Sequence, residues 1–305
     1  MRPGPKAPFL QMSEATPLQP LDVQTAADLI NRQFPELARL EIRLQPSLGT
    51  DNTIVRIGRD LCARFPKAAW ATGTAQRETG VLPRMGRAPI AVPAVYGAGQ
   101  PSETYPHSWS VLSWLPGIPL TDGALADPAA AAGQLAGFRA FLRSVPPDDA
   151  FRFCPGNNWR GAPLSVRTGS FQAALARLPD VDAAWANRLW SQALRAEAPF
   201  SPAWLHGDIH PGNILVENGQ LSGVIDWGLC GVGDAACDLL SAWAMFDAPA
   251  REIFRAALGA SEAEWLRGAG WALSMAVIFL PYAYENGLPC DMSEKMIERL
   301  MEDFA

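Results

Sequence analysis

The segment that most limits how this chain can fold is NILVENGQLSGVIDWG, which runs from Asn213 to Gly228. Two apolar runs flank Asn218-Gly219, and this dipeptide is the strongest short-range signal for a β-hairpin turn. The two ends of a hairpin lie close in space, so Asn213 at the start of the first strand should approach Asp226 at the end of the second. The pattern therefore predicts that an amide and a carboxylate from distant positions share one site.

Two histidines and an aspartate precede the hairpin, in the stretch WLHGDIHPGN. His206, Asp208 and His210 could be metal ligands, as in a binuclear phosphoesterase, or they could form the catalytic loop of a phosphotransferase. The chain has three histidines, so only His107 would remain to complete a binuclear centre. A mononuclear site made from this stretch alone is also disfavoured, because the turn at Pro211-Gly212 follows at once. We therefore favour the catalytic loop.

The spacing from His206 to Asn213 reproduces the pattern H-x-D-x-x-x-x-N, and VIDWG stands where protein kinases have D-F-G. Any one of these residues alone would be explained better as a turn residue, but the combination favours phosphoryl transfer. Asp208 is predicted to orient the acceptor hydroxyl and take its proton, and Asn213 and Asp226 to supply oxygen ligands for Mg²⁺. His206 is predicted to bond the backbone of the loop, and His210 to face solvent or pack in the loop.

The order of these motifs resembles that of the aminoglycoside phosphotransferase family, which shares the protein-kinase-like fold with choline kinases and macrolide kinases. The resemblance covers nearly the whole chain after residue 20. It implies an α+β fold with two lobes, a small N-terminal lobe with an antiparallel sheet and a larger, mainly helical C-terminal lobe. The matching segments, in chain order, are LGTDNTIVRIG, LCARFPK, RETGVLP, YPHSWSVLSWLPG, WLHGDIHPGNILV, GVIDWG and GVGDAACDLLSAW.

A change in composition near residues 114–117 divides the chain, because strand-like runs come before it and Ala- and Leu-rich helical patterns after it. We expect a flexible N-terminal lead-in (1–20), a nucleotide-binding lobe (21–113), a hinge (114–117) and a helical lobe with the catalytic loop and acceptor site (118–305). The predicted strands of the first lobe are Leu40–Leu44, Thr53–Ile57 and Leu61–Phe65, and the predicted helices are residues 27–38, 75–85, 127–145 and an apolar helix at 270–284 that ends near Pro281.

One basic residue of the first lobe leaves its strand on the face opposite to the apolar side chains, because LCARF alternates. The family resemblance implies that a basic residue on this third strand grips the α- and β-phosphates of the nucleotide, held by a glutamate from the following helix. Arg64 and Glu78 occupy these positions, although Glu78 could also be an exposed helix carboxylate. Lys67 is the rival of Arg64. We favour Arg64, because a guanidinium binds phosphate and carboxylate oxygens bidentately.

The loop that would cover the phosphates lacks the pattern G-x-G-x-x-G and instead reads LGTDNT. Gly49, Thr50 and Asn52 are the candidates for phosphate contacts there, and an ordinary hairpin turn is the alternative. The adenine or guanine base of ATP or GTP is expected to bond the backbone of Ser113 to Leu115. Trp114 would either wall the base pocket or pack in the core.

Charge, cysteine content and apolar runs limit which partners and which cellular compartment we expect. The net charge is −6 and no run is rich in Lys or Arg, so neither nucleic acid nor an anionic membrane is expected as the main partner. The number of cysteines is five and none forms C-x-x-C, which favours reduced thiols in a cytoplasmic protein. The N-terminus has no apolar core of a secretory signal, and the run at 270–284 is too short to cross a bilayer. The oligomeric state is left open.

Two departures from protein kinases favour a small-molecule acceptor. Gly207 stands where protein kinases have the arginine of H-R-D, and no A-P-E follows D-W-G. The resemblance favours a hydroxyl of an aminoglycoside-like acceptor, as in antibiotic-resistance enzymes, while relatives handle macrolides, choline-like alcohols and other metabolites. A catalytically inactive nucleotide-binding scaffold and a phosphohydrolase are the alternatives.

The acceptor pocket has no motif of its own. A cationic acceptor would need clustered acids, and four tryptophans of the final third could wall an apolar acceptor or fill the core, which we favour. In GDAACDLL, Asp234 is predicted to cap a helix and Asp238 to be a buried structural carboxylate. The available acids are Asp122, Asp127, Asp148, Asp149, Glu285 and Asp291, and the tryptophans are Trp227, Trp243, Trp265 and Trp271.

Overall fold

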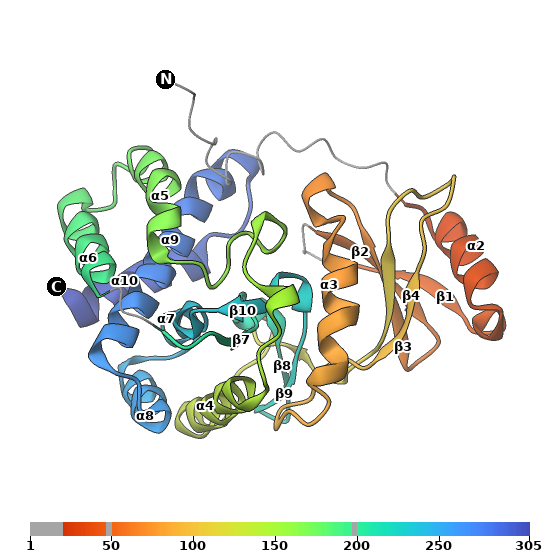
Figure 1. Cartoon of the computed structure of the whole chain (residues 1–305), viewed down its shortest axis with the longest axis horizontal. Coiled ribbons are helices and arrows are strands. Elements are labelled where there is room, and N and C mark those ends of the chain that lie inside the picture. The colour runs from red at the N-terminus through yellow and green to blue at the C-terminus, as the bar shows by residue number, and fades with distance from the viewer. Residues whose placement is uncertain (1–20, 47–50, 197–199) are drawn as a thin grey trace.

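The small lobe is a five-stranded antiparallel sheet with two helices (Figure 1). The computed structural model describes residues 21–46, 51–196 and 200–305, so the predicted lead-in at 1–20 lies outside it. The strands lie in the order β1-β2-β3-β5-β4. Their bounds are β1 Ile42–Gln45, β2 Asn52–Ile57, β3 Leu61–Pro66, β4 Val95–Gly99 and β5 Trp109–Ser113, and the helices are α2 Val23–Gln33 and α3 Thr74–Val81.

Alternation along the strands gives the sheet two different faces. Phe65 of β3 lies in a core that also holds Ile30 of α2 and Trp109 of β5. The side chain of Cys62 points to the opposite face of the sheet from Phe65, and it belongs to the core cluster that continues into the large lobe. Arg64 lies on the same face of β3 as Cys62, so its side chain points toward the large lobe and away from α2.

The large lobe is mostly helical, and its longest helix, α9, packs against α5, α6, α7 and α10 (Figure 1). Two small sheets, β10-β7 and β6-β8-β9, complete it. The two lobes and the antiparallel sheet confirm the predicted α+β architecture. The helices are α4 Pro128–Ser144, α5 Thr168–Leu175, α6 Ala183–Arg195, α7 Leu240–Met245, α8 Ala248–Leu258, α9 Glu262–Asn286 and α10 Asp291–Phe304, and the strands are β6 Ile118–Pro119, β7 Ala203–Leu205, β8 Ile214–Glu217, β9 Gln220–Val224 and β10 Gly231–Gly233.

Short 3-10 turns connect these elements. Those of the first 180 residues are Pro35–Leu37, Ala69–Ala71, Leu82–Arg84, Asp149–Phe151, Pro155–Asn157 and Leu164–Arg167, and the later ones are Pro211–Asn213, Trp227–Leu229 and Ala235–Leu239. Between β5 and β6 the chain passes through residues 114–117, and the role of this segment as a hinge stays a prediction.

The hairpin predicted from Asn218-Gly219 is confirmed. Strands β8 and β9 pair in antiparallel fashion on either side of this dipeptide. Asn218 has φ 52° and Gly219 has φ 76°, and two consecutive positive φ values are what the tight turns of two-residue hairpins require.

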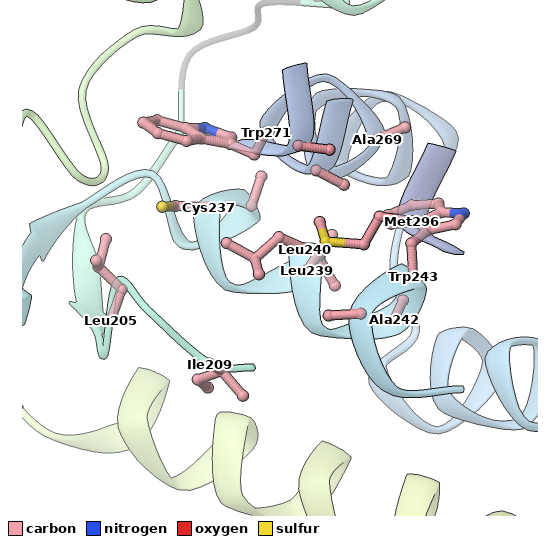
Figure 2. Close-up of a cluster of buried hydrophobic side chains, with 14 of the residues drawn as sticks. Leu205, Ile209, Cys237, Leu239, Leu240, Ala242, Trp243, Ala269, Trp271 and Met296 are labelled. Carbon is pink, nitrogen blue, oxygen red and sulfur yellow. The ribbon is translucent and has the colours of Figure 1, made fainter. Parts of the chain in front are cut away.

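The four tryptophans of the final third fill the core, as favoured from the sequence. Trp227, Trp243, Trp265 and Trp271 are all buried. Figure 2 shows Trp243 and Trp271 in one cluster with Leu239, Leu240 and Met296. These rings are therefore not available to wall an acceptor. All five cysteines are free thiols.

The predicted end of the apolar helix near Pro281 is wrong. Helix α9 begins at Glu262, contains Pro281 and continues to Asn286, where Gly287 ends it with φ 62°. A proline inside a helix removes one backbone hydrogen bond, and packing of the apolar helix in the core offsets this loss. Within the described ranges, α9 is the one helix long and apolar enough to cross a membrane, and 78% of its most apolar window is buried in the protein, which is typical of a core helix.

Element boundaries in the small lobe also differ from prediction. The helix predicted at 75–85 ends at Val81, and a 3-10 turn at Leu82–Arg84 follows it. The strand predicted at Leu40–Leu44 begins only at Ile42, because the N–H of Leu40 closes a turn on the carbonyl of Leu37 at 2.9 Å. The helix predicted at 27–38 ends at Gln33, because Pro35 disfavours helical backbone at the residue before it.

Candidate active site

The hairpin brings the predicted metal ligands to one place. The N–H of Ile225, next to Asp226, donates to the carbonyl of Asn213 at 2.9 Å. The amide Nδ2 of Asn213 donates to the backbone carbonyl of Asp208 at 3.0 Å and to its carboxylate Oδ2 at 3.2 Å. Because Nδ2 is used in this way, Oδ1 is the atom of Asn213 that can accept a cation. The hairpin therefore sets Asn213 beside the segment that carries Asp226, as the sequence predicted, and Asn213 contacts Asp208.

A buried carboxylate and a buried imidazole shape the catalytic loop. The carboxylate of Asp238 accepts the backbone N–H groups of His206 at 2.8 Å and Gly207 at 2.7 Å. His206 accepts the N–H of Asp208 on Nδ1 at 3.3 Å, so the proton lies on Nε2, which contacts the carbonyl of Ile225 at 3.0 Å. Burial lowers the pKa of His206, so the ring is neutral. His206 and Asp238 are structural, as predicted, and both ring nitrogens of His206 are in use.

The ion pair predicted between Arg64 and Glu78 is confirmed. Nε of Arg64 lies 3.2 Å from Oε2 of Glu78, and Nη2 lies 2.6 Å from Oδ1 of Asp226. Glu78 is buried and also accepts the hydroxyl of Ser110 at 3.1 Å and the N–H of Trp227 at 3.3 Å. Burial lowers the pKa of Arg64, but Asp226 and Glu78 outweigh burial and raise that pKa above its usual value. Arg64 is therefore a fixed cation.

The rival basic residue lies outside this network. Lys67 follows the end of β3 at Pro66, and its backbone N–H donates to the carbonyl of Asp51 at 2.8 Å. Arg64, in contrast, joins α3 to the end of the hairpin through Glu78 and Asp226. The geometry favours Arg64, and its contact with nucleotide phosphates stays a prediction.

Substitution of Arg64 by methionine should raise the KM for nucleotide about 10- to 100-fold, because charge-assisted hydrogen bonds contribute about 1.5–3 kcal/mol each. Substitution of Lys67 by methionine is the matched control and should leave this KM unchanged. Steady-state kinetics with varied nucleotide measure both, after circular dichroism has shown that each variant is folded. A larger effect of the Lys67 variant would assign the phosphate contact to Lys67 instead.

Two basic side chains that the sequence did not assign to the site lie beside Asp208. Nη2 of Arg160 lies 3.2 Å from Oδ1, and Nε2 of His210 lies 3.5 Å from Oδ2. Burial raises the pKa of Asp208, but His210 and Arg160 outweigh it and hold the pKa below its usual range. Asp208 is therefore an ionised carboxylate that can accept a hydrogen bond from a hydroxyl.

His210 and Arg160 differ in how far the sequence could reveal them. His210 packs within the loop, its Nδ1 accepting the N–H of Gly212 at 3.1 Å, so the loop-packing alternative is correct. Arg160 comes from a loop well before Asp208 in the chain, in the stretch NNWRG, which carries no recognisable motif.

Two backbone N–H groups of the segment predicted to bind the base, Ser113 to Leu115, form hydrogen bonds within the protein. The N–H of Ser113 donates to the carbonyl of Ala94 at 2.8 Å, and the N–H of Trp114 donates to that of Asp60 at 2.7 Å. These two N–H groups are thus not available to a base, which leaves Leu115 as the backbone donor of the predicted contact. The indole of Trp114 is half-buried, and the guanidinium of Arg56 lies 3.9 Å from the centre of its ring.

The remaining sequence candidates are less informative. Asn52 is buried at the start of β2 and pairs with Pro66, while Gly49 and Thr50 lie outside the described residues. Asp234 caps the turn at Ala235–Leu239 as predicted, and it also pairs with Arg267 at 2.6 Å.

Three of the six acids proposed for a cationic acceptor have other partners in the structure. Asp127 caps α4, Asp148 pairs with Arg84 at 2.8 Å, and Glu285 pairs with Arg177. Among the histidine, cysteine and acidic side chains that the structure describes, the one group of three with close ligand atoms is Cys290, Asp291 and Glu294, in and next to α10.

Comparisons with known proteins identify the family and the fold. Residues 43–271 match the family model described as the phosphotransferase enzyme family. The viomycin phosphotransferase of Streptomyces vinaceus is 32% identical over 196 residues, a match that covers 59% of this chain and 60% of that protein. The matched part therefore spans less than two thirds of that relative's length.

Solved structures share the fold. The GDP complex of a variant of aminoglycoside 2′-phosphotransferase-IIIa is similar with a TM-score of 0.71 and 20% identity, over 92% of this chain and 97% of that one. The macrolide 2′-phosphotransferase MphH from Brachybacterium faecium is similar with a TM-score of 0.58 and 19% identity, over 92% of this chain and 98% of that one. At this level of identity the likeness shows the two-lobe fold of these kinases.

Proposed function

The chain belongs to the phosphotransferase enzyme family, and we propose that it transfers the γ-phosphoryl group of ATP or GTP to a hydroxyl of a small-molecule acceptor. The observation that carries this proposal is that Asp208, Asn213, Asp226 and Arg64 form one connected set of contacts between the lobes. Phosphoryl transfer depends mainly on positioning and on neutralising charge, and these are the side chains that such a site requires.

The reaction follows from the roles of these residues. Asp208 accepts a hydrogen bond from the acceptor hydroxyl and takes its proton as the hydroxyl oxygen forms a bond to the γ-phosphorus. The bond from that phosphorus to the bridging oxygen breaks, and the nucleoside diphosphate leaves. Arg64, fixed by Glu78, steadies the phosphates of the nucleotide.

The donor atoms at the hairpin ends fit magnesium. Oδ1 of Asn213 and the carboxylate of Asp226 are hard oxygen ligands of the kind that Mg²⁺ prefers, and the side chain of Asp226 is 33% exposed. When bound there, Mg²⁺ would neutralise charge on the phosphates. Asp226 has φ 64°, a left-handed conformation that is uncommon outside glycine and is typical of functional sites.

We propose an antibiotic-like acceptor, because the relatives are named as phosphotransferases of viomycin, aminoglycosides and macrolides. A screen with ATP and GTP in the presence of Mg²⁺ tests this, across viomycin, aminoglycosides, macrolides and hydroxylated metabolites. The expected result is an acceptor whose mass increases by one phosphoryl group while nucleoside diphosphate is released. Tight nucleotide binding without transfer would instead support an inactive scaffold, and phosphate release from phosphoesters without nucleotide would support a phosphohydrolase.

A further inference from the structure

Arg160 holds one oxygen of the Asp208 carboxylate while Asn213 contacts the other. Nη2 of Arg160 lies 3.2 Å from Oδ1, and Nδ2 of Asn213 lies 3.2 Å from Oδ2. The side chain of Arg160 is 3% exposed, and its Nη1 contacts the sulfur of Met275. A carboxylate held at both oxygens cannot rotate about its terminal bond, so its orientation is set before any acceptor binds.

The backbone that presents Arg160 has an unusual conformation. Asn158 and Trp159 have φ 54° and 58°, and Gly161 has φ 79°, so Arg160 has left-handed residues on both sides. Side-chain hydrogen bonds of Asn157 hold the loop, because its Nδ2 donates to the carbonyl of Arg160 at 3.1 Å. Left-handed backbone at residues other than glycine is costly and persists where the surroundings enforce it, most often at functional sites.

Gly207 makes room for this arginine. It has φ 85°, and a Cβ placed on it would lie 2.7 Å from the carbonyl oxygen of Leu229 and 3.1 Å from Cβ and Cγ of Arg160. The stem of Arg160 thus passes directly over the backbone of the catalytic loop. Protein kinases carry an arginine at the position of Gly207. Here an arginine from another loop contacts Asp208, and a side chain at position 207 would crowd both its stem and the carbonyl of Leu229.

We propose that Arg160 is a positioning residue for phosphoryl transfer, which sets the orientation of the Asp208 carboxylate, and that Gly207 is required for its approach. This inference rests on the proposed function, because it concerns how Asp208 meets the acceptor hydroxyl. It predicts that loss of Arg160 slows transfer without weakening nucleotide binding, since the phosphate contacts come from Arg64.

The test compares Arg160→Met, Arg160→Lys and Gly207→Ala with the control Arg152→Met. Arg152 lies in the same region, is exposed and pairs with Asp149 at 2.8 Å, so the control removes a charge without touching the site. Arg160→Met should lower kcat about 100-fold and leave the KM for nucleotide unchanged, because a small misplacement of a reacting group costs about this much. Arg160→Lys should keep part of the kcat that Arg160→Met loses. Gly207→Ala should also lower kcat, and combining Gly207→Ala with Arg160→Met should lower kcat little further than Arg160→Met alone.

Several outcomes would overturn the inference. If Arg160→Met is folded and keeps a kcat close to wild type while Asp208→Asn is inactive, Arg160 has no positioning role and the proposed function stands. If Arg160→Met does not fold, Arg160→Lys and Gly207→Ala decide, and wild-type kcat in both would overturn it. If the wild-type protein transfers phosphate to no acceptor, the proposed function fails, and a crystal structure of Arg160→Met decides: a rotated Asp208 carboxylate supports the inference, and an unchanged one overturns it.

Discussion

Replacement of Asp208 by asparagine should lower kcat for phosphoryl transfer by about 10²- to 10⁴-fold, the usual contribution of a positioned acid or base. Asparagine keeps the size of the side chain and one oxygen for Arg160, but it cannot take the proton of the acceptor hydroxyl. Its amide nitrogen would also meet Nδ2 of Asn213, which now donates to Oδ2 of Asp208 at 3.2 Å. The KM for nucleotide should stay close to wild type, because Asp208 is not predicted to contact the phosphates.

Steady-state kinetics on the best acceptor of the screen measure this effect, and Asp180→Asn is the matched control. Asp180 is exposed between α5 and α6, so its substitution removes one carboxylate of the same lobe without touching the site. A kcat of Asp208→Asn within tenfold of wild type would show that another group takes the proton. Because His210 and Arg160 hold the pKa of Asp208 low after burial has raised it, the carboxylate is ionised in the resting enzyme, and its loss should be felt across the neutral pH range.

The hairpin could be predicted because its signal is local. Asn218-Gly219 specifies its own turn by tolerating positive φ, and the alternation on either side of it sets the strands. The proximity of Asn213 and Asp226 then follows from the hairpin alone. The same local alternation placed Arg64 on the face of β3 that meets Glu78.

Arg160 could not be predicted because its position depends on tertiary structure. It lies 48 positions before Asp208, in a loop whose left-handed residues, Asn158 and Trp159, are not signalled by glycine. From the sequence, Gly207 marks the loss of a kinase arginine, and the structure adds a steric reason for the glycine. The sequence shows which residue is absent from the loop, but not which distant residue fills the space.

The error at Pro281 has the same origin. Local rules end a helix near a proline, because one hydrogen bond is lost. Helix α9 continues for five more residues because its apolar length is buried against other helices, a gain that no local pattern reports.

The acceptor acids could not be placed either, since their positions depend on how loops such as those of Asp122 and Asp148 fold.

Replacement of Asp226 by asparagine should lower kcat/KM at least about 10³-fold, as expected when charge stabilisation of the transferring phosphoryl group is lost. Asparagine is the sharpest substitution here, because Asp226 has φ 64° and asparagine tolerates left-handed backbone better than alanine does. Oδ1 of Asp226 is engaged by Arg64 at 2.6 Å, so the substitution removes the negative charge while one oxygen can still face the guanidinium. The loss should therefore reflect the metal site rather than a displaced Arg64.

Magnesium dependence separates this variant from Asp208→Asn. The Asp226 variant should need more Mg²⁺ for half-maximal turnover and should lose the part of nucleotide binding that depends on Mg²⁺, whereas the Asp208 variant should keep both. Titration of Mg²⁺ in kinetic and nucleotide-binding assays measures this, with Asp60→Asn as a control, since Asp60 is an exposed residue of the turn between β2 and β3. Wild-type kcat and an unchanged Mg²⁺ requirement in Asp226→Asn would remove Asp226 from the metal site, and the end of the hairpin would then serve only to anchor Arg64.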